Sequence, residues 1–310
     1  MDVNCIFESN SEMLRAIWDR GVSLFESFSP EEVSLHQSPY GFLAYLRAYL
    51  CLIGDREGAR IFLQDAYKQI MTSGNRQMLY MFPIALEHYV NYADDRLFAS
   101  DMVERCEEEL TRSLPANFPT GNFETDALFL GALFALFRLR GKVGFSGGVS
   151  VRVALTERFH ALYYQAKTGQ YHDGAGLVTP ATQILPMAFG FLHEGAHGTI
   201  RRWLIEESFS TPRELRLLLY DAVYAEELFD LLMPTLIEGG IPNTRVTPAD
   251  LSGLVCIVTH LCGVDLTMMG QGIQASTPHF PHGVTYSLTI PSAHVYLSFE
   301  SEDYPGELVF

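Results

Sequence analysis

The sequence has few basic residues and no cluster of them. Its 310 residues include 21 Lys and Arg against 37 Asp and Glu, which gives a formal net charge of −16 at pH 7. Negative charge of this size repels the phosphates of nucleic acids and the headgroups of anionic lipids. We therefore expect no nucleic-acid partner and no membrane partner.

The chain also lacks long apolar runs and a cysteine framework. No segment reaches the ~18 to 20 apolar residues of a membrane span, and the start "MDVNCIFESN" lacks the basic and apolar regions of a signal peptide. The cysteines are odd in number and show no C-x-x-C spacing, which disfavours both disulfides and a zinc knuckle. We expect a cytoplasmic protein with reduced, mostly buried thiols at Cys5, Cys51, Cys106, Cys256 and Cys262.

Helical periodicity covers most of the chain. Between residues 10 and 263 the pattern predicts about twelve helices of two alternating kinds. One kind is amphipathic, with a face suited to water, near 10–28, 56–72, 96–113, 150–166, 196–207 and 223–237. The other kind is apolar nearly all round and needs surrounding helices, near 40–54, 80–92, 126–141, 182–192 and 251–263. A sixth inner candidate, "TPRELRLLLYDA", is weaker because it carries charges at Arg213, Glu214 and Arg216.

This alternation predicts an all-α fold, a closed (α/α)6 barrel of six helical hairpins. The connections into the inner helices are mostly long and rich in turn formers, at 28–40, 73–79, 114–125, 167–181 and 238–250. They would gather on one rim, called the long-loop rim below, where helix N-termini favour anionic or hydroxyl-rich ligands.

After residue 271 the pattern changes to that of β-strands. The stretch "GVTYSLTIPSAHVYLSFES" predicts two or three strands, with Pro291 at the turn. We expect a barrel domain at 1–265 and a small β-strand tail at 266–310 that packs on the barrel.

Several stretches resemble the α-L-rhamnosidase family of inverting glycoside hydrolases. "FESNSEMLRAIWDRGVSLF" resembles the first barrel helix of that family. "ALFLGALFALFRLRGK" and "ALTERFHALYYQAKTGQYHDGAGLVTPATQILPMAFGFL" resemble its mid-barrel run, and "VTYSLTIPSAHVYLSFE" resembles its closing β-sandwich strands. The resemblance implies the six-hairpin barrel and chemistry on a glycoside.

Both catalytic motifs of that family are degenerate in this chain. The family's acid lies in an Asp…Arg-Glu…Trp-x-Gly-Asp stretch, and the corresponding "SFSPEEVSLHQSPYG" at 27–41 has neither Arg-Glu nor Trp. The family's base follows a Trp in a Thr-x-Trp-Glu segment, whereas Glu238 here follows Ile237. Inversion needs two carboxylates roughly 6 to 10 Å apart, which Glu31 or Glu32 with Glu238 could provide, although the sequence does not fix their distance. Because both motifs are degenerate, we do not expect a standard α-L-rhamnosidase.

The candidate catalytic residues all lie at the start of an inner helix or in the loop before it. They are Glu31, Glu32, His36, Glu124 and Asp126. A histidine at this rim could act as an acid or base near neutral pH. The carboxylates have a structural alternative, because "SPEE" and "NFETD" are also ordinary helix starts with capping residues.

The candidate substrate-binding residues lie on the same rim. In "YHDG" at 171–174, three side chains would sit beside the head of the next inner helix. The full set of candidate substrate-binding residues is Tyr40, Tyr171, His172, Asp173, Thr182 and Gln183.

One motif points to metal chemistry. "HEGAH" at 193–197 matches the His-Glu-x-x-His pattern of zinc enzymes. However, Gly195 weakens the helix that must hold the ligands, and the segment falls at a return connection away from the long-loop rim. We expect no metal and no cofactor, and we expect His88 and His260 to be buried and hydrogen-bonded.

Three functions fit the sequence. The first is an enzyme that acts on a glycoside or another small polar molecule in the rim pocket. The second is a biosynthetic isomerase, lyase or cyclase, with Tyr40, Tyr45 and Tyr49 shaping an aromatic cavity. The third is a non-catalytic carbohydrate-binding or scaffold protein. The substrate and the oligomeric state stay open.

Overall fold

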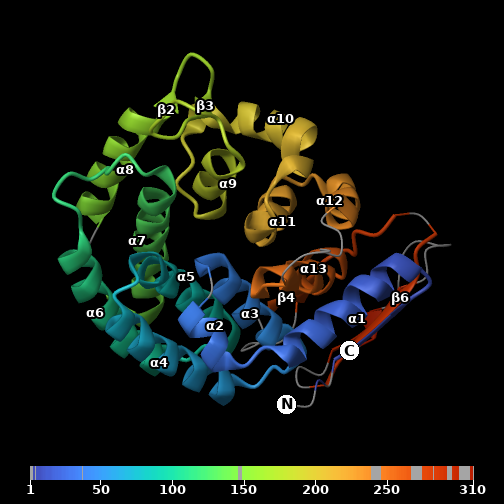
Figure 1. The fold of residues 1–310 in the computed structure, drawn as a ribbon. Coiled ribbons are helices and arrows are strands. Elements are labelled where there is room, and N and C mark those ends of the chain that lie inside the picture. The colour runs from blue at the N-terminus through green and yellow to red at the C-terminus, as the bar shows by residue number, and fades with distance from the viewer. Residues whose placement is uncertain are drawn as a thin grey trace.

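The helices form two concentric rings around one axis (Figure 1). The computed structural model describes residues 3, 5–36, 38–145, 149–238, 246–266, 274–281, 283–291, 295–299 and 308–309. The inner ring consists of α3 (Pro39–Leu52), α5 (Arg76–Ala93), α7 (Phe123–Val143), α9 (Pro180–Ala188), α11 (Arg216–Ala225) and α13 (Ser252–Cys256). Each inner helix packs on the next, and α13 packs on α3, so the ring is closed.

The outer ring covers the inner one. It consists of α1 (Glu12–Ser27), α4 (Arg56–Ser73), α6 (Arg96–Ser113), α8 (Val149–Tyr163), α10 (His197–Glu207) and α12 (Leu232–Glu238). The two rings bury different fractions of their helices: every residue of α3 is buried, whereas α4 buries a stripe from Ala59 to Ile70 at helical spacing. The predicted (α/α)6 barrel is confirmed.

The charges that made the sixth inner helix a weak candidate do not disturb it. Arg213 and Glu214 lie in η3 (Arg213–Leu215), a 3₁₀ turn before α11. Arg216 is buried in α11, and its Nη1 donates a hydrogen bond to the carbonyl oxygen of Thr235 at 2.8 Å. A buried arginine is tolerated where its N–H groups find acceptors.

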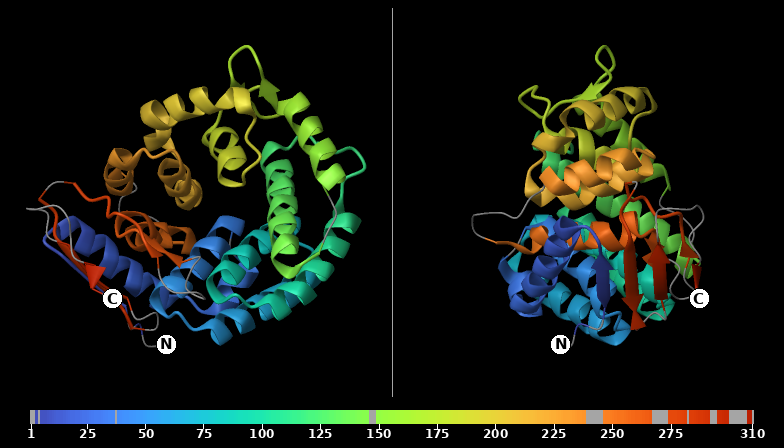
Figure 2. Two further views of the ribbon diagram at one scale, coloured as in Figure 1. Left: turned by 180° about the vertical axis from the view of Figure 1, so that it is seen from behind. Right: turned by 90° about the vertical axis from the view of Figure 1, so that its right-hand side faces the viewer.

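A small antiparallel sheet packs on α1 (Figure 2). Its strand order is β1 (Ile6–Ser9), β6 (Tyr286–Ile290), β7 (Val295–Phe299) and β8 (Leu308–Val309). The strands at 286–290 and 295–299 match the prediction, and Pro291 ends the first of them. The first strand was not predicted, because four residues are too few to show an alternating pattern.

The β1 strand joins the two ends of the chain. Phe7 is paired with Leu288, and its ring packs between Trp18 at 5.3 Å and Tyr286 at 6.2 Å between centroids. The sheet therefore uses strands from both sides of the predicted boundary between 1–265 and 266–310. That division stays a prediction.

Other short elements lie between these helices and strands. A helix α2 (Pro30–His36) precedes α3, the ribbon β2 (Tyr164–Gln165) and β3 (Gln170–Tyr171) follows α8, and β4 (Val264–Asp265) pairs with β5 (Gln274–Ala275). All five cysteines are free and buried as predicted, and burial raises the pKa of Cys51 to about 12. Among the described helices, none has the length and apolar character to cross a bilayer.

Candidate functional site

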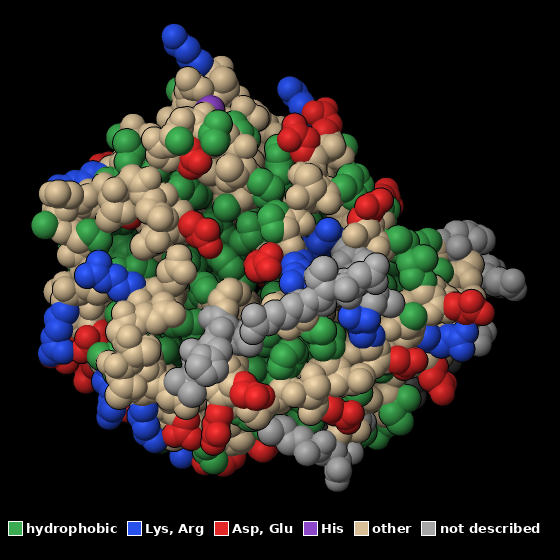
Figure 3. Space-filling model, in the orientation of Figure 1, with side chains coloured by type: hydrophobic (Ala, Val, Ile, Leu, Met, Phe, Trp, Pro, Cys, Tyr) green, Lys and Arg blue, Asp and Glu red, His purple; other side chains and the backbone are tan. Residues whose placement is uncertain are grey.

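A pocket of about 360 Å³ lies at the N-terminal ends of α7 and α9, on the predicted long-loop rim. Hydrophobic and acidic side chains surround the hollow centre of the ring in the view of Figure 3. The pocket is lined by the loop before α7 and the turn before α9, with Gly121, Asn122, Phe123, Glu124, Asp173, Gly174, Ala175, Thr179, Ala181 and Thr182.

Glu124 is the candidate catalytic residue that lines the pocket and does not cap a helix. The N-cap of α7 is Asn122, whose side chain accepts a hydrogen bond from the backbone N–H of Thr125. Glu124 is half-buried, and its Oε1 accepts a hydrogen bond of 2.8 Å from the hydroxyl of Tyr40 on α3. Burial, together with the nearby Glu124 carboxylate, raises the pKa of Tyr40, so its phenol stays protonated and orients Glu124.

Asp126 has a structural position. It is buried, and it accepts hydrogen bonds from the backbone N–H and the hydroxyl of Thr120 at 2.7 and 2.9 Å. A third bond of 2.6 Å comes from the hydroxyl of Tyr163 on α8. The carboxylate therefore ties the loop before α7 to the outer helix, and it is not among the residues that line the pocket.

The structure brings the residues of the cluster at 171–183 close together, but two of them serve to hold the fold. Tyr171 is fully buried, and its hydroxyl accepts a hydrogen bond from the backbone N–H of His193 at 2.8 Å. Gln183 is equally buried and donates from Nε2 to the carbonyl oxygen of Tyr171 at 2.8 Å. These two side chains fix the β3 strand against α9 and do not line the rim pocket.

The turn residues of this cluster reach the pocket. Asp173 lines it, and its Oδ1 accepts hydrogen bonds from the backbone N–H groups of Ala175 and Leu177, which hold the turn. Thr182 also lines it, and forms a capping box with Thr179 at the start of α9. His172 lies beside them, with Nδ1 3.0 Å from the carbonyl oxygen of Gly176.

The carboxylates of the opening loop lie elsewhere. Glu31 and Glu32 are exposed in the first turn of α2, and Glu32 Oε2 accepts hydrogen bonds from both the N–H and the hydroxyl of Ser29. The helix start expected for "SPEE" is thus present. Glu238 is exposed at the end of α12, and the side chain of His36 lies outside the described residues. Of the described carboxylates, Glu124 and Asp173 line the rim pocket.

The His-Glu-x-x-His stretch does not form one metal-binding helix. His193 caps a 3₁₀ turn, η1 (Glu194–Ala196), and α10 begins only at His197. The ring of His193 stacks on Tyr164 at 4.1 Å, while His197 Nε2 lies 3.1 Å from Glu226. The part of the chain that is described contains no group of three or more potential metal ligands.

The structure contains a second polar cluster that was not predicted from the sequence. Arg47 on α3 forms an ion pair of 2.6 Å with Asp221 on α11, and Asp221 also lies 2.9 Å from His260. His260 is buried and hydrogen-bonded as predicted. The signal was present in the sequence, because a lone Arg and a lone Asp in nearly apolar inner helices must find partners when buried.

A closed ring of helical hairpins with a polar rim pocket and an appended sheet defines the class of (α/α)6-barrel proteins. Within that class the fold is rhamnosidase-like, as the sequence resemblance predicted. A GH78-family rhamnosidase from Bacillus sp. GL1 superposes with a TM-score of 0.69 at 10% identity, over 96% of this chain and 40% of that one. The α-L-rhamnosidase of Streptomyces avermitilis, solved with L-rhamnose, has a TM-score of 0.62 at 13% identity, over 96% of this chain and 36% of that one.

The likeness is one of fold. This chain spans about two fifths of the length of the two rhamnosidases. No protein-family model matches the sequence, and no curated protein matches it.

Proposed function

We propose that the protein binds a glycoside or another small hydroxylated molecule in the rim pocket, and that Glu124 is the carboxyl group that contacts it. The observation that carries the proposal is the position of Glu124. It lies half-buried in a pocket wall, is oriented by Tyr40 and is not needed as a helix cap. The rhamnosidase-like fold supports a sugar as the ligand.

The pocket has the size and chemistry for one or two sugar rings. Its volume of about 360 Å³ is near the lower end of the ~300 to 1,000 Å³ that is common for ligand pockets. A carboxylate accepts hydrogen bonds from neighbouring sugar hydroxyls, and such charge-assisted bonds are among the stronger ones. Ala181, which is partly exposed, supplies apolar surface for the ring.

The geometry favours a protein that binds a sugar over one that catalyses the standard reaction of the rhamnosidase family. The carboxylates at the family's acid position, Glu31 and Glu32, are exposed, and Glu32 is engaged in a reciprocal capping arrangement with Ser29 at the start of its own helix. Asp173, the second carboxylate of the pocket, holds its turn through Oδ1. We therefore expect little or no turnover of aryl α-L-rhamnosides.

Isothermal calorimetry tests the proposal with L-rhamnose, other neutral monosaccharides and aryl glycosides as probes. We expect Glu124→Gln to weaken binding of the best probe by tenfold or more, about 1.4 kcal/mol. Tyr40→Phe should weaken it less, because it only frees the carboxylate to move. The control is Glu206→Gln, at an exposed position on α10.

Two results would contradict the proposal. One is an absence of binding for the whole panel. The other is equal affinity of Glu124→Gln and Glu206→Gln. Aryl glycoside turnover that Glu124→Gln abolishes would favour the enzyme over the binding protein.

A further inference from the structure

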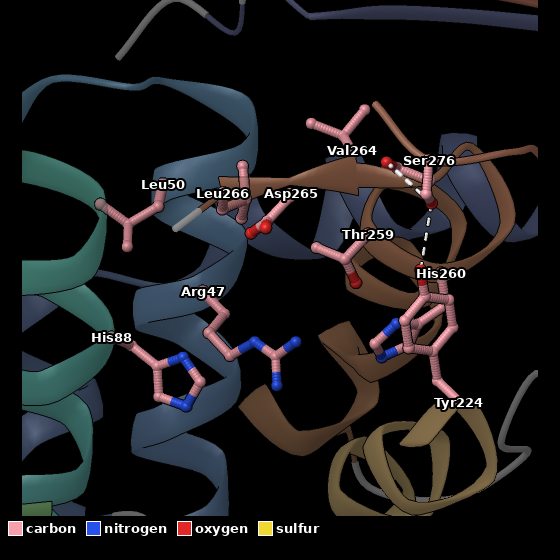
Figure 4. Close-up of a pocket in the computed structure, with 11 residues that line it drawn as sticks. Arg47, Leu50, His88, Tyr224, Thr259, His260, Val264, Asp265, Leu266 and Ser276 are labelled. Carbon is pink, nitrogen blue, oxygen red and sulfur yellow. Dashed lines mark hydrogen bonds between the residues drawn. The ribbon is translucent and has the colours of Figure 1, made fainter. Parts of the chain in front are cut away.

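A second cavity of about 350 Å³ lies at the other end of the barrel, towards the C-terminal ends of the inner helices (Figure 4). Side chains from α3, α5 and α11 and from η6 (Ile257–Leu261) reach it, and β4 runs past its edge. Among the described residues, the two cavities have no lining residue in common. It also lies away from the loop that corresponds to the family's acid-bearing stretch.

A charged anchor forms one wall. Asp221 lies between Arg47 at 2.6 Å and His260 at 2.9 Å. Burial alone would raise the pKa of Asp221, but Arg47 and His260 outweigh it and hold that pKa well below its usual range. The positive charge of Arg47 is therefore offset by a carboxylate that stays ionised.

Arg47 keeps hydrogen-bonding capacity for a ligand. Only 7% of its side chain is exposed, and among the described residues its one hydrogen-bond partner is Asp221, reached through Nη1. A guanidinium has five N–H donors in a fixed plane, so donors remain for a molecule in the cavity.

His88 adds a neutral donor and acceptor on the other side of Arg47 (Figure 4). Burial, reinforced by the charge of Arg47, lowers the pKa of His88 to about 3. The imidazole is therefore neutral at physiological pH, with one nitrogen that donates and one that accepts. No hydrogen bond to a described residue occupies either nitrogen, so the prediction of a hydrogen-bonded His88 is wrong for the described part of the chain.

An aromatic and hydroxyl-bearing wall faces these groups. Tyr224 stacks on His260 with 4.7 Å between centroids and 27° between planes. The Tyr224 hydroxyl lies 3.0 Å from Ser276 Oγ. Leu50 and Leu266 supply apolar surface.

We propose that this far-end cavity is a second ligand site, and that it takes a small neutral hydroxylated molecule such as a monosaccharide or polyol. Sugar hydroxyls can accept from Arg47 and both donate to and accept from His88, while the ring packs on Tyr224. An anion is disfavoured because Asp221 already neutralises Arg47 and a further carboxylate, Asp265, lines the cavity.

The Glu124→Gln protein is the background for the test, because it weakens the rim pocket and leaves the far end intact. Crystal soaks and calorimetry use D-glucose, L-rhamnose and myo-inositol as neutral probes, and D-glucuronate as a matched anion. We expect one neutral probe to bind with a stoichiometry of one and to weaken tenfold or more in His88→Phe. D-glucuronate should bind at least tenfold more weakly than D-glucose.

Two controls keep the result interpretable. Tyr224→Phe removes one hydroxyl with little risk to folding, and should weaken binding about threefold to tenfold. Circular dichroism checks that His88→Phe is folded. The proposal is overturned if no neutral probe binds the Glu124→Gln protein, if neither variant changes the affinity, or if D-glucuronate binds more tightly. A rim pocket that proves empty leaves these readouts unchanged, so the two proposals fail separately.

Discussion

At the scale of single residues, the ion pair between Arg47 and Asp221 has two effects. It holds two inner helices together, and it sets the charge in the wall of the far-end cavity. The pair bridges α3 and α11, and the side chain of Asp221 is 25% exposed while that of Arg47 is 7% exposed. An isolated charge in such a place is costly, whereas a paired one is tolerated. Removal of one partner should therefore destabilise more than removal of both.

Asp221→Ala should lower the free energy of unfolding by about 2 to 4 kcal/mol, because it strands Arg47; the partial exposure of Asp221 keeps the loss at the lower side of the usual range. The double variant Arg47→Met/Asp221→Leu should recover at least half of that loss. Urea denaturation compares these two variants with the native protein and with the single variants Arg47→Met and Asp221→Leu. Strictly additive effects of the two positions would contradict a direct interaction.

The candidate residues show what sequence can and cannot assign at this scale. The sequence located Glu124, Asp173 and Thr182 on one rim, and the structure gathers them in one pocket. It could not separate a cap from a ligand contact, because Asn, Asp, Glu, Ser and Thr serve both purposes at a helix start. The choice depends on which hydrogen bonds each side chain makes across the fold, as the Thr120 and Tyr163 bonds of Asp126 show.

At the scale of elements, three inner helices meet closely at a glycine. Gly131 on α7 faces Phe189 at the end of α9 and Ile84 on α5. An added Cβ would lie 2.7 Å from Phe189 Cδ2 and 3.1 Å from Ile84 Cδ1. Since the phenylalanine ring is buried and rigid, the helices would have to move apart.

Gly131→Ala should destabilise the protein by about 1 to 3 kcal/mol through overpacking. Gly141→Ala is the matched control on the same helix, because a Cβ there has no atom within 4 Å. The control should be neutral or stabilise by up to about 1 kcal/mol, as alanine favours helix. Equal effects of the two variants in thermal unfolding would refute the close approach.

Prediction of the elements succeeded where the pattern was long. Helical periodicity over a dozen residues distinguishes an inner helix from an outer one, as α3 and α4 show. Prediction failed for β1, and for the ribbon of β2 and β3 that ends α8 at Tyr163, because their two to four residues carry no period.

At the scale of the whole molecule, the strand β1 connects the sheet to the barrel, because it pairs with β6 and packs on α1. Phe7 is 6% exposed between Trp18 and Tyr286, whereas its neighbour Ile6 is 57% exposed. Closure of the ring and the pairing of residues 6–9 with 286–289 are contacts between distant parts of the chain. Local patterns do not encode the pairing of residues 6–9 with 286–289. Closure of the ring was predicted indirectly, from the alternation of inner and outer helices and from the family resemblance.

Phe7→Ala should lower the free energy of unfolding by about 2 to 4 kcal/mol, because it opens a cavity between α1 and the sheet. Ile6→Ala should change it by less than about 0.5 kcal/mol, since that side chain faces solvent. Chemical denaturation compares the two neighbours. A similar loss in both would mean that β1 does not pack as described.

The central claim is that the rim pocket binds a sugar through Glu124, and a crystal soaked with the tightest-binding sugar of the calorimetric panel tests it most directly. We expect density for the sugar between the loop before α7 and the turn before α9, with a hydroxyl about 2.6 to 3.0 Å from a Glu124 oxygen. Density at the far-end cavity alone, or an empty rim pocket in a crystal soaked to saturation, would contradict the claim.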